Sequence, residues 1–363
     1  MQNFKKAIGI IAGIICVQYS LKAQDTVQCN CYQRPDYHAP IGVMIDHGNK
    51  KGEWMVSYRL MDMNMSGSRM GTEHISPDQV YKQYVMRATA MNMQMHMLMA
   101  MYGISNKITV MAMANYVYNS MNMGMTIYGM GSMMNMTNMS MMNTTSTMQS
   151  SSYSYGLGDT KVYALYTIVD KQNHQVLISG GINIPTGSVT IKNSPSMTEM
   201  GSCSIASYNM QTGTGTFGIL PGITYTGQNS SFSWGVQGLA DVELGTNSQS
   251  YRVGNQFTTN LWLSRKWAKW ISNSIRINSN ATGLINGFSS TLYPYGIAYD
   301  PTANTANTGG FISSVLAGVS ILPGGFFRGH QLSVEAGLPL YNYVNGIQMN
   351  TKFLLNAGWQ YNF

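Results

Sequence analysis

The chain has 363 residues, only 10% of them charged, and its mean hydropathy of -0.10 is close to neutral. Soluble domains usually carry about 25% charged residues, so the composition excludes a surface that lies wholly in water. The formal net charge of +7 comes from few charges that are spread along the chain, and this pattern argues against a nucleic-acid partner.

The N-terminus is typical of a secretory signal peptide. Two lysines are followed by an apolar segment at residues 7–17, and Ala23 supplies a small residue before a cleavage point. We therefore expect residues 1–23 to be a signal peptide and residues 24–51 to form an N-terminal segment ahead of the main fold. The sequence leaves open whether that segment is a periplasmic tail or a plug in a lumen.

Twelve segments of the remaining chain alternate between apolar and polar residues, as strands with two different faces do. No apolar run after the N-terminus approaches the roughly 20 residues of a membrane helix, which leaves the closed barrel as the membrane-spanning option. Residues 52–363 therefore predict an all-β, antiparallel, up-and-down membrane β-barrel of about 12 strands. The segments lie at about residues 52–63, 86–102, 107–119, 156–170, 174–187, 216–226, 231–244, 252–267, 270–283, 311–322, 330–343 and 349–363.

The connections between these segments differ in length. Short ones lie at residues 103–106, 171–173, 227–230, 268–269 and 323–328, and most of the others are longer. Outer-membrane barrels have short periplasmic turns and longer external loops. With a periplasmic C-terminus, every short connection falls on the periplasmic side, so we expect localisation to the bacterial outer membrane. Ser76 and Pro77 in the first long connection predict the start of a short helix.

The last strand has the clearest alternation. One face carries Phe353, Leu355, Ala357, Trp359, Tyr361 and Phe363. The other face is mostly polar and includes Asn356 and Gln360. We expect the aromatic face to contact lipid, with its last rings at the membrane interface. The terminal Phe363 resembles the C-terminal signature of bacterial outer-membrane barrels.

Charged residues indicate which face of a strand points into the lumen, because a charge on the lipid face is costly. This rule predicts a lumen that carries both signs of charge. A barrel of about twelve strands is wide enough for water, small solutes or a partial plug. The predicted lumen-lining residues are Arg59, Asp159, Lys161, Asp241, Glu243, Arg276 and Glu335.

Methionines are concentrated in one part of the chain: all but five of the 31 lie between Met44 and Met148. They are either apolar filler or ligands for a soft ion such as Cu(I) or Ag(I). In the run at residues 91–101, Asn92, Gln94 and His96 occupy the opposite face and suit a lumen. We therefore expect the methionines of this strand to face lipid as filler.

In the predicted Met-rich loop at residues 121–148, a role as apolar filler explains the methionines less well than it does in residues 91–101. A solvated loop gains nothing by exposing thioethers. Low-complexity drift and soft-metal capture both remain open there. The first and third strands end on the same side of the membrane, which would bring their methionines together at the extracellular mouth. The candidate metal ligands are Met61, Met63, Met65, Met121, Met123 and Met125.

Other chemical motifs are weak. Cys29 and Cys31 form a pair that falls short of a full zinc pattern. His38, His47 and two further histidines are spread along the chain rather than spaced as ligands. The chain contains no phosphate-binding loop, zinc-protease motif or nucleophile elbow. We therefore expect no enzyme, no catalytic residue and no cofactor, apart from the Cu(I) hypothesis.

Several short motifs resemble the MetA-pathway of phenol degradation family, whose members are outer-membrane proteins often described as transporters. They are Gly-Leu-Gly-Asp at residues 156–159, Gly-Ile-Asn-Ile-Pro-Thr-Gly at residues 181–187, and Tyr102-Gly103 before the first tight turn. The N-terminal region from His38 to Arg59 resembles a Met-rich branch. The resemblance covers most of residues 38–363 and implies a barrel that passes small, often aromatic or apolar solutes.

We therefore expect an outer-membrane channel or transporter whose partners are the membrane lipids and a small-molecule solute. An outer-membrane protein that binds copper or silver is the alternative, and an outer-membrane enzyme is a minor one. The sequence does not indicate an oligomeric state or name the solute.

Overall fold

The computed structural model describes residues 34–363 except for residues 127–146, 172, 193–204 and 293–299. The predicted signal peptide and all four cysteines lie outside the described residues. Most of the described chain forms a single antiparallel sheet of 14 strands. Among the described helices, none is long and apolar enough to cross a membrane.

The strands of this sheet are β1 (Trp54–Gly71), β2 (Glu73–Ile75), β3 (Met86–Gly103), β4 (Ile108–Thr126), β5 (Thr147–Leu157), β6 (Thr160–Lys171), β7 (His174–Ile184), β8 (Phe217–Ile219), β9 (Gly222–Gln228), β10 (Phe232–Leu244), β12 (Gln256–Ala268), β13 (Ile271–Thr282), β15 (Gly310–Ile321) and β16 (His330–Asn362). A separate small sheet pairs β11 (Tyr251–Arg252) with β14 (Asn286–Gly287). The helical elements are α2 (Pro77–Tyr81) and the 3-10 turns η3 (Tyr208–Met210), η5 (Pro301–Ala303), η6 (Thr305–Asn307) and η7 (Gly325–Phe327).

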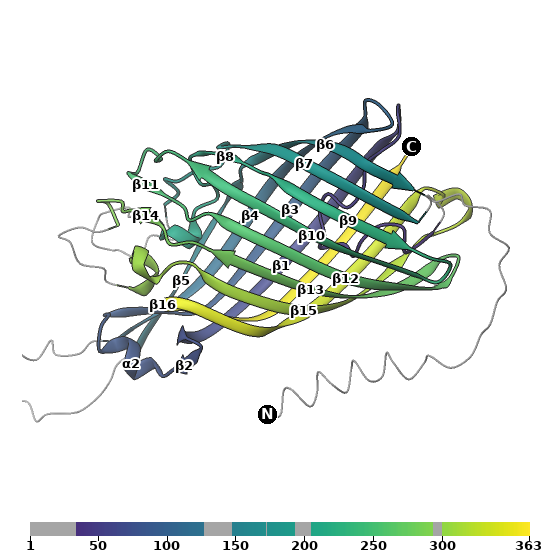
Figure 1. The fold of residues 1–363 in the computed structure, drawn as a ribbon. Coiled ribbons are helices and arrows are strands. Elements are labelled where there is room, and N and C mark those ends of the chain that lie inside the picture. Colours follow the sequence, from purple (N-terminus) through teal and green to yellow (C-terminus); the bar gives the residue numbers. More distant parts are fainter. Residues whose placement is uncertain (1–33, 127–146, 172, 193–204, 293–299) are drawn as a thin grey trace, which may run out of the picture. The chain divides into compact units, whose positions relative to one another are not determined.

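The large sheet closes on itself. Its strands pair in the order β1, β3, β4, β6, β7, β9, β10, β12, β13, β15 and β16, and β16 pairs again with β1. A sheet that closes in this way has no unpaired main edge. The predicted fold class, an all-β antiparallel closed barrel, is therefore confirmed (Figure 1).

Strand β16 is 33 residues long because it contains a reversal of the chain. Its first half pairs with β15 and its second half with β1. Side chains of the two halves meet across the strand pair: Gln360 donates to Gln331 at 3.0 Å, and Asn342 donates to Asn350 at 3.2 Å. Gly346 lies between the halves with a φ of 59°, a conformation that glycine adopts readily. The two halves correspond to the two predicted strands at residues 330–343 and 349–363.

The connections differ at the two ends of the barrel. Figure 1 shows the C-terminus at the end that carries the short turns, whereas α2, β2 and β11 lie at the other end. We call these the turn end and the loop end. At the loop end, Ser76 caps α2 as predicted: its hydroxyl accepts from the Gln79 amide and its own amide donates to the Gln79 side chain.

The strands at the loop end are longer than predicted. β1 continues to Gly71 and β4 to Thr126. The predicted range of the Met-rich loop, residues 121–148, is therefore too long. Residues 121–126 belong to β4, and residue 147 begins β5. β4 and β5 pair along this stretch, so their backbone groups are satisfied by each other. The methionines between residues 127 and 146 lie outside the described residues.

On β13 and on the last half of β16, the polarity of the two faces is the reverse of that in a soluble protein. On β13, Ser272, Ser274 and Arg276 are buried, whereas Ile275 and Ile277 are exposed. On the last half of β16, Asn356 and Gln360 are buried and Phe353 and Phe363 are exposed. An apolar exterior around a polar interior is the pattern of a barrel in lipid.

Candidate functional site

The interior of the barrel holds the N-terminal part of the described chain, residues 34–53, which we call the lumen segment. It contains neither helix nor strand, so its backbone groups need partners from elsewhere. Inward-facing side chains of separate strands supply them. Arg59 on β1 donates to the carbonyls of Ile41 and Val43 at 2.8 and 2.6 Å. Thr224 on β9 donates to the carbonyl of Ile45 at 3.0 Å.

The same pattern continues around the barrel. Ser272 on β13 donates to the carbonyl of Pro35 at 2.9 Å, and Thr109 on β4 accepts from the amide of Asn49 at 2.9 Å. Gln237 on β10 donates to the carbonyl of Ile45 at 3.1 Å. The lumen segment is thus held from several sides of the barrel wall. This part of the predicted N-terminal segment therefore contacts the inner face of the barrel.

Close packing accompanies these hydrogen bonds. A Cβ atom placed on Gly42 would lie 2.1 Å from Nη2 of Arg276 and 2.6 Å from Oε2 of Glu335. These two atoms belong to an ion pair between Arg276 and Glu335, so a side chain at position 42 would require the pair or the backbone to shift. On the neighbouring side, a Cβ atom on Gly358 would lie 2.8 Å from Ile41. The lumen segment therefore fits the wall closely.

Ile45 has an unusual backbone conformation, with a φ of 59°. A β-branched residue rarely adopts this left-handed region, and such strain persists only where surrounding contacts enforce it. The carbonyl of Ile45 accepts from both Thr224 and Gln237, and its side chain is buried among methionines of the wall. These contacts account for the conformation.

The seven predicted lumen residues are buried or partly buried in the structure, and they form two groups. In the first, Arg276 makes two hydrogen bonds to Glu335, both 2.8 Å long. Both side chains are almost fully buried, at 3% and 1% exposure. The third member, Arg59, holds the lumen segment as described above.

The second group contains Lys161 on β6, Asp241 and Glu243 on β10, and Asp159, which lies just before β6. Lys161 forms an ion pair with Asp241 at 2.6 Å. Asp159 accepts from the amide of Thr214 at 2.8 Å, and Glu243 accepts from the hydroxyl of Thr216 at 2.7 Å. These partners belong to the chain between β7 and β8, so the second group ties that connection to the inner wall.

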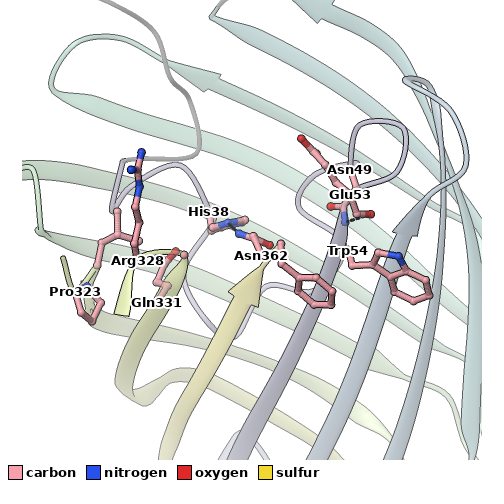
Figure 2. A pocket seen from close by; sticks show the side chains of 11 residues that line it. His38, Asn49, Glu53, Trp54, Pro323, Arg328, Gln331 and Asn362 are labelled. Atoms are coloured by element: carbon pink, nitrogen blue, oxygen red, sulfur yellow. Dashed lines mark hydrogen bonds between the residues drawn. The ribbon is translucent and has the colours of Figure 1, made fainter. Parts of the chain in front are cut away.

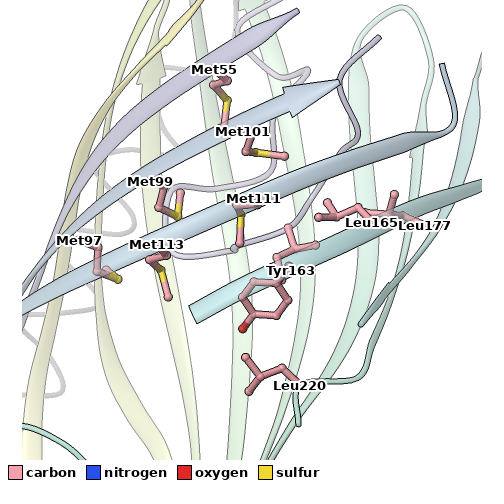
Figure 3. Packing of buried hydrophobic residues seen from close by; sticks show 11 residues of the cluster. Met55, Met97, Met99, Met101, Met111, Met113, Tyr163, Leu165, Leu177 and Leu220 are labelled. Carbon is pink, nitrogen blue, oxygen red and sulfur yellow. The ribbon is translucent and has the colours of Figure 1, made fainter. Parts of the chain in front are cut away.

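The methionines of β3 face the lumen, and the prediction that residues 91–101 present them to lipid is wrong. Arg59 on β1 pairs with Met97 on β3, and directly paired residues share a face of the sheet. The intervening Leu98 is 57% exposed on the outside. Figure 3 shows the resulting inward cluster of methionines from β1, β3 and β4, packed against Tyr163, Leu165, Leu177 and Leu220.

The polar residues of β3 that were expected to line the lumen instead form an outer cluster with β1. Asp62 accepts from Asn92 at 2.9 Å and from Gln94 at 2.8 Å. His96 shares a hydrogen bond of 2.7 Å with Tyr58. Because these groups satisfy one another across the strand pair, they do not need the lumen. This cross-strand pairing is the physical reason for the error.

A second cluster of methionines lies farther toward the loop end. It contains Met91, Met121, Met123 and Met210, with Met65, Met86, Met93 and Met349 partly buried around it. Of the six candidate metal ligands, Met65, Met121 and Met123 therefore lie in this cluster. Met61 packs against the first cluster instead. Met63 lies between Met61 and Met65 on the same face of β1, and Met125 pairs with Met86.

The lumen segment also brings His38 next to two consecutive residues that follow it in the chain, Asp46 and His47. Asp46 lies 2.9 Å from Nδ1 of His47 and 3.5 Å from Nδ1 of His38, and the two imidazole rings are 4.4 Å apart. All three side chains are buried. The expectation that these histidines are unrelated is therefore wrong for His38 and His47.

The electrostatics of the three groups are coupled. Burial lowers the pKa of His38, and the neighbouring His47 lowers it further. Burial by itself would raise the pKa of Asp46, but the two histidines outweigh that effect and hold it well below its usual range. Asp46 is therefore an anion at neutral pH. The signal that the sequence did contain is the adjacent pair Asp46-His47, eight residues after His38 and separated from it by a turn at Pro40 and Gly42.

A pocket of about 350 Å³ opens at the turn end next to this group. It is lined by His38, Asn49, Trp54, Arg328 and Asn362, among others (Figure 2). Nε2 of His38 and the amide of Asn362 lie 3.2 Å apart at its inner wall. The pocket gives the buried histidine a route to solvent.

No family model and no curated protein matches the chain. Among solved structures, the chain is similar to an outer membrane channel from Pseudomonas putida F1, with a TM-score of 0.54, 12% identity, and coverage of 88% of this chain and 98% of that one. The chain has the fold of an outer-membrane channel. At this identity, the likeness establishes the fold alone.

Two further similarities have TM-scores too low to support an argument. The toluene transporter TbuX from Ralstonia pickettii gives 0.38 at 11% identity, with coverage of 92% of this chain and 93% of that one. The P. putida toluene transporter TodX also gives 0.38, at 10% identity, with coverage of 87% and 90%. All three proteins are described as channels or transporters rather than as enzymes.

Proposed function

We propose that the protein is an outer-membrane channel for small apolar solutes. The observation that carries this proposal is the inner wall of the closed barrel, where three adjacent strands, β1, β3 and β4, present methionines to the lumen. Thioether side chains are apolar, flexible and polarisable, so they adapt to apolar molecules of different shape. A channel for ions or sugars would gain little from such a wall.

The arrangement of the lumen supports a selective path rather than an open pore. The lumen segment occupies the interior next to the turn end, where it contacts β1, β4, β9, β10 and β13. Met61, Met63, Met93 and Met95 are only partly buried. We infer that solutes enter from the loop end, reach these methionines and then meet the plug.

We also propose that the barrel crosses the membrane twelve times. This count treats the two halves of β16 as separate crossings, and treats β5 with β6, and β8 with β9, as one crossing each. β5 and β6 both pair with β4 on the same side, and β8 and β9 both lie between β7 and β10. The even number agrees with single-chain bacterial barrels and places both ends of the barrel at the periplasm.

Purified protein in lipid vesicles and planar bilayers would test the channel. We expect uptake of a small aromatic such as toluene into the vesicle interior, together with low ion conductance because the plug restricts water. Deletion of residues 34–49 should raise the conductance. A barrel that passes neither toluene nor ions, with or without the deletion, would refute the proposal.

A second function, binding of Cu(I) or Ag(I), is supported by the second methionine cluster. Soft thioethers select such ions, and Met65, Met121 and Met123 lie there with further methionines around them. Titration of Cu(I) against a competing chelator should show binding that falls when these three become Leu. Leu variants of Met99, Met101 and Met111 in the first cluster are the matched control. Equal Cu(I) affinity in the wild type and in both variants would show that the methionines have a purely apolar role.

A further inference from the structure

The group His38, Asp46 and His47 has the chemistry of a metal site. Each residue can bring one ligand atom within 4.8 Å of the other two. Two imidazoles and one carboxylate are the protein ligands of several catalytic zinc sites and of non-haem iron sites. All three ligands come from the lumen segment, and none comes from a strand of the barrel.

Two buried ring nitrogens in this group lack a well-formed hydrogen bond. Nδ1 of His38 has only Oδ2 of Asp46 at 3.5 Å, and Nε2 of His47 has no partner. An unsatisfied buried nitrogen is costly, and such groups in a native structure call for a partner such as an ion. Asp46 adds a negative charge beside them, and its Oδ2 also accepts from the amide of Ala39 at 2.9 Å. The group is therefore prepared for a cation.

Neighbouring residues fix the orientation of the rings. The amide of Asn362 faces Nε2 of His38 at 3.2 Å. The nearer atom is Nδ2 of Asn362, which donates to this nitrogen. A 180° flip of the amide would turn its oxygen to the ring, so that Asn362 accepts the Nε2 proton and leaves Nδ1 free to bind, an arrangement common around metal-bound histidines. Arg59 lies near enough for its charge to lower the pKa of His38, and this charge weakens binding of any cation. Arg59 is, however, directed at two backbone carbonyls.

We propose that His38, Asp46 and His47 bind a divalent transition-metal ion of the Zn(II) type, which closes the loop of the lumen segment between residues 38 and 47. Ligand atoms in a tetrahedral zinc site lie about 3.4 Å apart, given bonds of about 2.1 Å, so a small inward movement of the three side chains completes the site. Of the three ligands, His38 lines the pocket at the turn end.

The ion would act on the plug. Residues 39–45, which lie between the ligands, are those whose carbonyls meet Arg59, Thr224 and Gln237. Fixing the two ends of this loop holds its contacts with the wall in place. The site is independent of which solute the barrel carries, since binding can be measured without transport.

The test uses the mature barrel with a tag that contains no histidine, after removal of bound metal. Co(II) serves as a spectroscopic probe and Zn(II) as its competitor. We expect one Co(II) per chain, with visible absorption bands of a four- or five-coordinate site that Zn(II) abolishes. Asp46→Asn, and separately His38→Gln with His47→Gln, should lower the affinity at least tenfold. His174→Gln, on the outer face, is the matched control and should leave it unchanged.

Heat-modifiable migration on gels would show that each variant still forms a barrel. Cu(I) binding at the methionine clusters should survive in these variants, which separates the two metal hypotheses. A wild-type barrel that takes up no stoichiometric Co(II) would overturn the proposal. Equal Co(II) affinity in the wild type and the double histidine variant would do so as well.

Discussion

The ion pair between Arg276 and Glu335 offers the sharpest test of the inner wall. The two groups share hydrogen bonds of 2.8 Å and are 3% and 1% exposed. Glu335→Ala would leave the Arg276 charge buried without its partner, which costs about 3–5 kcal/mol. It would also remove the acceptor of Asn356, which donates to Glu335 at 3.1 Å, at about a further 1 kcal/mol. We expect a loss near the upper end of that range.

A double variant separates the ion pair from simple packing. Arg276→Met with Glu335→Leu removes both charges and keeps apolar volume, so it should be less destabilised than Glu335→Ala alone. The free energy of unfolding can be measured by urea titration in lipid vesicles, and Trp262, which pairs with Arg276, provides a nearby fluorescent reporter. Glu73→Ala, at the exposed loop end, is the control. A cost below about 1 kcal/mol for Glu335→Ala would show that water or another group compensates Arg276, and the reasoning would fail.

Three further predictions concern the faces of the wall and the plug. Arg in place of Ile275, which is exposed at mid-strand, should cost about 2–4 kcal/mol in urea titrations, whereas Ile321→Arg at the end of β15 should cost about 0–1 kcal/mol; equal costs would contradict the assignment of the outer face. Gly42→Val should displace the lumen segment, because even its Cβ would clash with Arg276, and should raise single-channel conductance; an unchanged conductance would show that the segment does not restrict the path. A nitroxide at Leu98→Cys, in a cysteine-free background, should be accessible to oxygen dissolved in lipid, and one at Met95→Cys should not; the reverse result would restore the predicted orientation of β3.

The strands could be predicted from the sequence because each carries its own evidence. Alternation marks where a strand lies, and a charge such as Arg59 fixes its inner face without reference to any neighbour. The orientation of β3 could not be read in that way. Its polar residues meet Asp62 of β1 across the sheet, and that register depends on the paired strand. The position of Asp62 indicated this partner. Side chains alternate along β1, so with Arg59 facing inward Asp62 faces outward, where it can pair with polar residues of β3.

The lumen segment was harder to predict for a related reason. It has no periodicity, so its position depends on long-range contacts such as those of Ile41 and Ile45 with the wall. The proximity of His38 to His47 follows from the turn between them and from the strained backbone at Ile45. Pro40 and Gly42 indicate the turn, but the strained backbone at Ile45 has no local sequence signal. The sequence therefore left open whether this part of the chain plugs the lumen.

The lumen segment also bears on how the barrel is sealed. Among the described residues, β1 is the first strand and the last half of β16 is the final one, so their pairing is the joint that completes the cylinder. The segment contacts both strands of this joint. Arg59 on β1 donates hydrogen bonds to its carbonyls. On β16, Gly358 lies against Ile41 and Asn362 lies against His38. We therefore expect the lumen segment to stabilise the pairing of β1 with β16 during assembly. A chain without it should insert more slowly and should part first at this joint under force or denaturant.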